Sequence, residues 1–321
     1  MKAAVITTYF NPSGYATRRR NYDLFIAGIR AAGVMCLTVE CVFPGQEFEL
    51  PESPDVIRVR AKTLLWQKER LLNLAESYLP ADIEAVAWID CDVLFLNRNW
   101  PRDLTRVLKK HPVAQMFEFA LRMDREGISE AEPRAESFGA VMTRNPLAFR
   151  ANRYDVHGHT GYAWAMRRSL FRKVGLYEAA VAGGADHFMS HALFDDYGFC
   201  IQNAMKDDPV QIAHLTAWGK RFRQAVVEEM GGDTTANPLG VVPGQIRHLW
   251  HGDLANRKYF LRLRELISYG FNPFTDLVAL PGQPLEWSQH MNKPELEKYF
   301  GRYFNQRRED GIEETHGACS C

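Results

Sequence analysis

Short apolar runs alternate with amphipathic stretches along the first part of the chain. Tyr22, Phe25 and Ile29 recur at three- and four-residue steps, which predicts a helix over residues 19–32. A second helix with the same periodicity is predicted over residues 64–78. Between and around these helices, β-branched and aliphatic runs predict four strands, at residues 3–8, 34–39, 56–59 and 86–89. Strands that alternate with helices predict an α/β fold with a mostly parallel, doubly wound sheet.

The pattern continues less regularly in the second half of the chain. Strands are predicted over residues 111–119, 138–142 and 158–166, and helices over residues 97–110, 168–174, 188–194 and 294–308. The residues after about Arg308 are polar and are expected to be unstructured, so a truncation before Gly311 should not change stability. The predicted parts are residues 1–96, residues 97–255, a helical C-terminal extension (256–310) and a disordered tail (311–321).

Two acidic residues one position apart follow the predicted strand 86–89. Ligands of open α/β sheets bind beyond the carboxyl ends of the strands, which is where Asp90 and Asp92 fall. Two carboxylates this close repel each other unless a cation or a shared proton intervenes. A hard divalent ion, Mn²⁺ or Mg²⁺, that carries a phosphorylated substrate is the simplest partner. The alternative is a helix cap or a surface acid pair, and the buried character of the strand favours the metal.

Composition narrows the class of protein. The chain has 321 residues, 46% of them hydrophobic and 24% charged, which is enough for a large core in one elaborated domain or two. The formal net charge is zero, so a nucleic-acid acceptor is not favoured, although it is not excluded. No stretch reaches the apolar length of a membrane span, and a cytoplasmic protein is expected. The six cysteines contain no C-x-x-C pair and are expected to be reduced.

Four stretches occur in an order that resembles a known family. They are Thr7-Thr8-Tyr9-Phe10-Asn11, the segment 66–73, Asp90-Cys91-Asp92, and the segment from Gly161 to Asp186. In this order the chain resembles GT-A-fold glycosyltransferases, similar to the family 2, family 7 and polypeptide N-acetylgalactosaminyltransferase groups. The resemblance implies a Rossmann-like mixed sheet flanked by helices, with a donor-binding half (1–96) and an acceptor and catalytic half (97–255). It also implies a metal-dependent hexosyl transfer from a nucleotide-sugar, with UDP as the expected nucleotide, to a carbohydrate or other hydroxyl acceptor. It further implies that Asp90 contacts the ribose and the hydration shell of the metal, and that Asp92 coordinates the metal.

Two histidines are candidates for completing the metal site. His251 resembles the late-strand histidine that GT-A enzymes often add to the metal, and His248 is a weaker candidate. Their spacing places them on opposite faces of a strand, so both could bind one metal only across a bend.

Asp186 is the candidate general base, because an acid that follows Gly183-Gly184 can approach a bound sugar. In an inverting mechanism a single carboxylate takes the proton of the acceptor hydroxyl. The alternative is that Asp186 only caps the helix predicted after it.

The donor also needs a cation near its diphosphate and polar groups near its base. Tyr162 is expected to face the site, whereas Trp164 is expected in the core. The remaining donor-side candidates are Thr8, Tyr9, Asn11, Glu40, Lys68 and Arg70.

Two other functions compete with glycosyl transfer. A haloacid-dehalogenase-like phosphatase would use Asp90 and Asp92, but that pattern normally lies on the first strand, and here several predicted elements precede it. A non-catalytic carbohydrate-binding protein would keep the fold and lack a metal ligand or a base.

Overall fold

The central feature of the fold is a mixed sheet whose strand order is β10-β6-β9-β4-β1-β2-β3. The computed structural model describes residues 1–151, 153–258 and 261–311, and the expected tail, with Cys319 and Cys321, lies almost entirely outside them. β1 to β4 and the pair β6–β10 are parallel, whereas β9 runs antiparallel to both of its neighbours. The predicted mostly parallel α/β sheet is therefore confirmed. The strands are β1 (Ala3–Tyr9), β2 (Met35–Val42), β3 (Val56–Arg60), β4 (Ala85–Ile89), β6 (Val113–Gln115), β9 (Ala163–Arg167) and β10 (Leu239–Val241).

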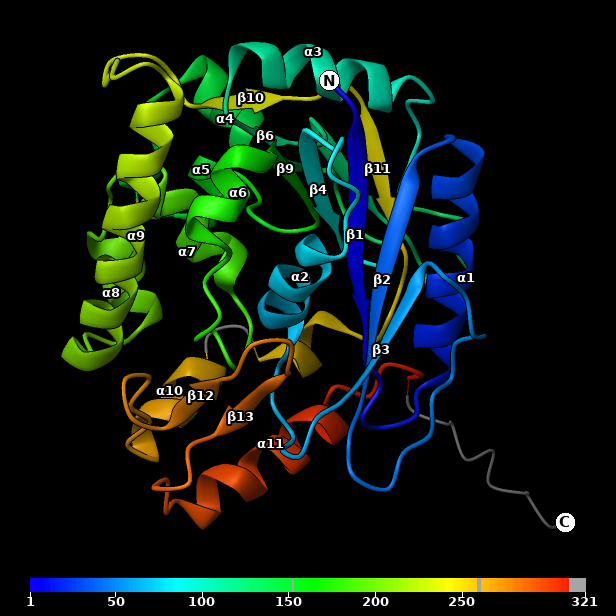
Figure 1. The fold of residues 1–321 in the computed structure, drawn as a ribbon, viewed down its shortest axis with the longest axis vertical. Coiled ribbons are helices and arrows are strands. Elements are labelled where there is room, and N and C mark those ends of the chain that lie inside the picture. Colours follow the sequence, from blue (N-terminus) through cyan, green and yellow to red (C-terminus); the bar gives the residue numbers. More distant parts are fainter. Residues whose placement is uncertain (152, 259–260, 312–321) are drawn as a thin grey trace, which may run out of the picture.

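Helices cover both faces of this sheet (Figure 1). Successive residues of a strand point to opposite faces, and β1 shows the result. Val5 belongs to the apolar cluster that contains Phe25, and Ile6 belongs to the cluster that contains Leu71. On the first face lie α1 (Ala16–Ala31) and α3 (Trp100–Lys110), and on the second lie α2 (Lys68–Ser77), α6 (Arg168–Val174) and α9 (Pro209–Glu229).

A smaller sheet joins segments from distant parts of the chain in the order β5-β11-β7-β8. Its strands are β5 (Val93–Phe95), β11 (Gln245–His248), β7 (Phe119–Arg122) and β8 (Ala135–Glu136). β11 is antiparallel to β5 and parallel to β7, with Arg247 opposite Leu94. This pairing brings a late segment of the chain to the residues that directly follow β4.

The C-terminal elements lie beyond the carboxyl ends of the parallel strands (Figure 1, orange to red). They are α10 (Arg262–Ser268), the hairpin β12 (Leu277–Ala279) and β13 (Leu285–Trp287), and α11 (Pro294–Gln306). The side-chain amide of Gln67 fastens the hairpin: it donates to the Leu285 carbonyl at 2.8 Å and accepts from the Leu285 N–H at 2.9 Å. The predicted helical extension thus packs directly against the entry to α2.

Two predicted strands differ from the structure. Residues 138–142 form the helix α4 (Phe138–Arg144), because Ser137 caps it by accepting a hydrogen bond from the Ala140 N–H at 3.1 Å. The strand predicted over residues 111–119 is reduced to β6, and its last residue, Phe119, begins β7, which belongs to the other sheet. The 21-residue helix α9 was not predicted at all.

The prediction that the chain is unstructured after Arg308 is wrong for residues 309–311. Glu309 is fully buried, and the Asp310 carboxylate accepts from the N–H groups of Ala16 and Thr17 at 2.9 and 2.7 Å. The carboxylate of Asp310 therefore caps the start of α1. Across the described residues, no helix is long and apolar enough to cross a membrane.

Candidate active site

The two acids of the D-x-D sequence lie between the two sheets. Asp90 directly follows β4, and its N–H donates to the Tyr162 carbonyl at 2.9 Å. Asp92 directly precedes β5, and its carbonyl accepts from the Leu249 N–H at 2.8 Å. The backbone of both acids is therefore held by β9 and by the end of β11. This fixes the two carboxylates at the carboxyl end of β4, the position that the strand pattern predicts.

Lys68 joins the first acid to the candidate base. Its ammonium lies 2.7 Å from Oδ1 of Asp90 and 2.8 Å from Oδ2 of Asp186. Burial disfavours the ammonium, but the Asp186 and Asp90 carboxylates outweigh it and hold the pKa of Lys68 well above its usual value. Burial, only partly offset by Lys68, raises the pKa of Asp90 to about 6. The sequence assigned Asp90 to the donor and Asp186 to the acceptor. These two carboxylates thus share the Lys68 ammonium.

Asp186 lies within a helix rather than in a loop. It occupies the first turn of α7 (Ala185–Ala192), and Gly184 holds the N-cap position with φ +100°. The interpretation of Asp186 as the cap is therefore wrong, because a glycine without a side-chain acceptor stands there. The positive φ values of Gly183 and Gly184 turn the chain sharply into α7 and aim its first turn at Lys68.

A second group forms around Asp92. Nε2 of His251 lies 3.4 Å from Oδ2 of Asp92, Nε2 of His248 lies 3.7 Å from Oδ1, and the two imidazole nitrogens are 2.9 Å apart. The two histidines can meet because β11 ends at His248, so the alternation of a strand no longer applies at His251; this is the interruption that the sequence required for both to bind one metal. Burial lowers the pKa of His248 to about 4, so its imidazole is neutral at physiological pH, as a metal ligand must be.

The group around Asp92 fits a divalent cation. Oδ1 of Asp92 is buried and has no hydrogen-bond partner among the described residues. Neighbouring ligand atoms of an octahedral ion with bonds of about 2.0–2.1 Å are about 2.9 Å apart. The two imidazole nitrogens have this separation, whereas the Asp92 oxygens, at 3.4 and 3.7 Å, would have to move closer to the histidines. Two imidazoles favour a transition-metal ion such as Mn²⁺ over Mg²⁺, which prefers oxygen ligands. Asp92, His248 and His251 are thus the described residues here that could hold the ion.

Surrounding residues hold these histidines in place. The Tyr162 ring lies between the rings of His159 and His248, with centroids 4.1 and 4.5 Å away, and its hydroxyl accepts from Arg122 at 3.0 Å. Tyr162 has φ +83°, a backbone conformation that non-glycine residues rarely adopt. A strained residue at this position is consistent with a constraint imposed by the site. Arg257 adds a hydrogen bond to the His251 carbonyl.

The donor-side candidates divide into two groups. Tyr9 and Asn11 lie at the end of β1, where both hydrogen-bond the carboxylate of Glu49. Thr8 precedes them and is half-buried. These three residues stay candidates for the nucleotide, and Glu49 joins them as an acid that the sequence did not single out.

Glu40 and Arg70 are engaged elsewhere in the structure. The Glu40 carboxylate accepts from the N–H groups of Glu49 and Leu50 at 2.5 and 3.0 Å, and it is fully buried. Arg70 donates to the Gln283 carbonyl at 2.8 Å and pairs with Glu178 at 3.2 Å. The structure therefore gives Glu40 a role in the 49–50 loop and Arg70 a role in holding the C-terminal hairpin. Trp164 is fully buried in the core, as predicted.

Sequence reasoning also missed a buried charge network beside the site. Arg18, Arg257 and Arg307 surround Glu309, with closest N–O distances of 2.8, 3.4 and 2.6 Å. Arg18 is the first of three consecutive arginines, a pattern that gives no sign of a buried partner. No local pattern identifies Glu309, because its partners come from three distant parts of the chain.

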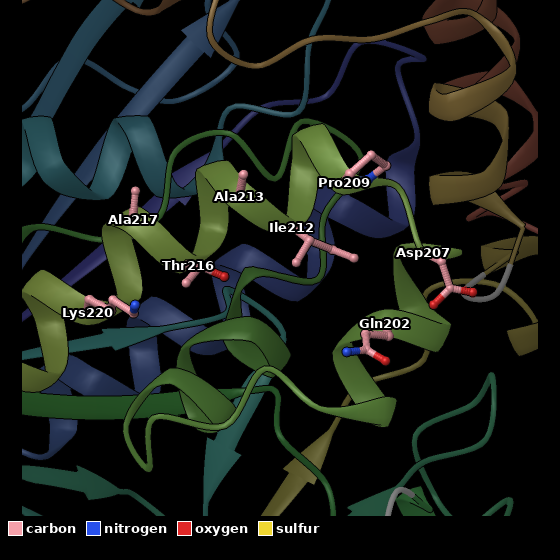
Figure 2. A pocket seen from close by; sticks show the side chains of 8 residues that line it. All are labelled: Gln202, Asp207, Pro209, Ile212, Ala213, Thr216, Ala217 and Lys220. Carbon is pink, nitrogen blue, oxygen red and sulfur yellow. The ribbon is translucent and has the colours of Figure 1, made fainter.

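A pocket on the outer surface has no part in this chemistry. It lies between α8 (Phe199–Ala204) and α9, and Figure 2 shows Lys220 and Asp207 at opposite ends of a row that includes Ile212, Ala213 and Ala217. None of the predicted site residues lines it.

Comparison with known proteins adds structural likeness only. No known protein family matches the chain, and no curated protein matches it in sequence. The structures it resembles include nucleotide-sugar transferases of the GT-A type.

One is a mutant of Drosophila β-1,4-galactosyltransferase 7 in complex with manganese, UDP-Gal and xylobiose, at 12% identity and TM-score 0.33, covering 59% of this chain and 60% of that one. A second structure of that enzyme, its catalytic domain with xylobiose, matches at 13% identity and TM-score 0.33, over 76% of this chain and 64% of its own. The chain thus spans less than two thirds of both galactosyltransferase chains. Mannose-1-phosphate geranyltransferase from Thermus thermophilus matches at 14% identity and TM-score 0.34, over 77% and 75% of the two chains. Similarity at this level does not decide an activity, so the functional argument has to come from the geometry of the site.

Proposed function

We propose that the protein is a glycosyltransferase that moves a hexosyl group from a nucleotide-sugar, with UDP as the nucleotide, to an acceptor hydroxyl with inversion of configuration. The observation that supports this most is the position of Asp186, which shares the Lys68 ammonium with Asp90. A candidate base therefore lies one side chain away from the acids that would hold the donor.

Asp92, His248 and His251 would hold Mn²⁺ or Mg²⁺ together with the donor diphosphate. The ion supplies Lewis-acid stabilisation of the negative charge that builds on the leaving diphosphate. Tyr9 and Asn11 are proposed to face the nucleotide, and Asp90 its ribose. Lys68 neutralises the carboxylates of Asp90 and Asp186 in the free protein, and it provides a cation at the donor when the nucleotide-sugar binds.

In the proposed reaction the acceptor oxygen forms a bond to the anomeric carbon while the bond from that carbon to the diphosphate oxygen breaks. The bonding electrons leave with the diphosphate, and the hydroxyl proton passes to the carboxylate of Asp186. Asp186 is suited to this by its position, because the first turn of α7 holds it next to Lys68 and thereby close to Asp90.

The test is the variant Asp186→Asn. Transfer should fall by roughly 10²–10⁴-fold, the usual contribution of a general base, while the affinity for the donor changes little. The exposed Asp195→Asn, just beyond the same helix, serves as the matched control and should transfer at the wild-type rate. NMR of the product should show inversion at the anomeric carbon. A near-wild-type rate for Asp186→Asn, or retention of configuration, would remove Asp186 from this role.

A further inference from the structure

Three histidines and one cysteine meet in the interior beneath α7. His187 and His191 lie one turn apart on that helix, His157 ends α5 (Tyr154–His157), and Cys200 lies on α8. All four side chains are buried. Their ligand atoms lie within 4.8 Å of one another, and none of these residues belongs to the candidate active site.

The distances within this cluster match a tetrahedral zinc site. Sγ of Cys200 lies 3.6 Å from Nε2 of His157 and 3.4 Å from Nε2 of His187. Around a tetrahedral ion with Zn–N bonds of about 2.0–2.1 Å and Zn–S bonds of about 2.3 Å, a nitrogen and a sulfur ligand are about 3.5–3.6 Å apart. The Cys200 sulfur therefore already stands at the separation from two of the histidines that zinc would require.

Hydrogen bonds on the outer side of the cluster orient two of the rings. Nδ1 of His157 lies 2.9 Å from the Gly158 carbonyl, and Nδ1 of His191 lies 2.7 Å from Oδ2 of Asp196. If these Nδ1 atoms carry the protons, Nε2 is the unprotonated nitrogen of each ring and can act as a metal ligand. Zinc-bound histidines are usually held in this way by a carbonyl or a carboxylate.

Hydrogen bonds among these four side chains do not explain why they lie together. A thiol has one proton, so Cys200 can donate to only one of the two nitrogens beside it. Nε2 of His191 is fully buried and has no hydrogen-bond partner among the described residues. A buried nitrogen without a partner is costly, and a cation at the centre of the cluster removes that cost.

We propose that His157, His187, His191 and Cys200 bind one Zn²⁺ ion in a closed tetrahedral site. Nitrogen and thiolate ligands suit zinc, and four protein ligands leave no position for water or substrate, so the ion has a structural role. It connects three short helices, α5, α7 and α8. Because Asp186 immediately precedes His187, the ion also fixes the helix that presents the proposed base.

The test uses the full-length protein purified in buffer without chelators. Elemental analysis should find about one zinc ion per chain, retained through gel filtration. After exchange with Co²⁺, the protein should show the strong visible absorption of tetrahedral cobalt and a near-ultraviolet thiolate-to-cobalt charge-transfer band. Asp92, His248 and His251 include no sulfur, so metal bound at that group cannot produce the charge-transfer band.

Two matched cysteine variants locate the ion. Cys200→Ala should lose the zinc and the charge-transfer band, whereas Cys36→Ala, also buried but in another part of the core, should keep both. If Cys200→Ala does not fold, the cobalt spectrum of the wild-type protein decides the question by itself. Wild-type protein without the charge-transfer band, another metal in place of zinc, or equal zinc in the two variants would overturn the proposal.

Discussion

Replacing Glu309 by glutamine should destabilise the protein strongly, although the residue lies after the last helix of the described chain. The Glu309 side chain is 1% exposed, and Arg18 binds both of its oxygens, at 2.8 and 2.9 Å. Arg257 and Arg307 complete the network. The neutral amide of Glu309→Gln would leave three arginines around a site without negative charge. Breaking a buried ion pair from one side costs about 3–5 kcal/mol.

That loss can be expressed as a melting temperature. An unfolding entropy of about 2.1 cal/mol/K per residue gives roughly 0.7 kcal/mol/K for a chain of this length, so Tm should fall by about 4–7 °C. Urea unfolding should give the free-energy loss directly. Glu297→Gln, an exposed glutamate on α11, is the control and should stay within about 0.5 kcal/mol of wild type.

Truncated chains separate the contribution of the Glu309 charge network to stability from that of the residues after Gly311. A chain that ends at Gly311 should keep the wild-type Tm, whereas one that ends at Arg308 should lose at least as much stability as Glu309→Gln. Mn²⁺ affinity should fall as well, because Arg257 binds both Glu309 and the His251 carbonyl. A Glu309→Gln protein as stable as the Glu297→Gln control would refute this reasoning.

Three further predictions concern the candidate active site. Asp92→Asn should abolish metal-dependent donor hydrolysis and leave the fold intact; full activity of the wild type in EDTA would contradict the metal assignment. Lys68→Met in metal-free buffer should cost about 1–3 kcal/mol at pH 7, because Asp90 and Asp186 lose their shared cation but stay partly exposed. That cost should be smaller below the Asp90 pKa of about 6, where Asp90 is largely protonated in the wild type as well. Urea unfolding at pH 7 and at a pH below 6 would show the difference. Burial raises the pKa of Glu69 from 4.5 to about 8, so the folded state binds a proton more tightly and stability declines as pH rises through that window. Glu69→Gln should remove the decline, and its Tm advantage over wild type should therefore be larger at pH 8 than at pH 5.

The positions of Asp90 and Asp92 depend on the order of the strands, and this half of the site could be predicted from the sequence. β4 has an apolar pattern, and Asp90 follows it at the edge where parallel strands present ligands, so both acids could be placed without a structure. The relation between Asp186 and Lys68 could not be derived in this way. It depends on how α7 packs against the start of α2, which no local periodicity encodes.

Two kinds of feature escaped prediction for physical reasons. The short apolar run at Phe138 fits a strand or a buried helix equally well, and only the cap at Ser137 decides between them. The histidine and cysteine cluster is spread over α5, α7 and α8, and within it only His187 and His191 have a helical spacing that a sequence could reveal. Sites whose members come from separate elements become visible only when the packing is known.

The order of strands in the two sheets has a consequence for folding. β1, β2, β3 and β4 pair with one another through residues that precede Asp90, so this half can assemble while the rest of the chain is still being synthesised. β5, in contrast, has to wait for β11, a strand from the last third of the sequence. Contacts this distant in sequence close slowly. Metal binding at Asp92 should therefore appear only in the final phase of refolding, after the parallel strands have formed, and can serve as a reporter of completed folding.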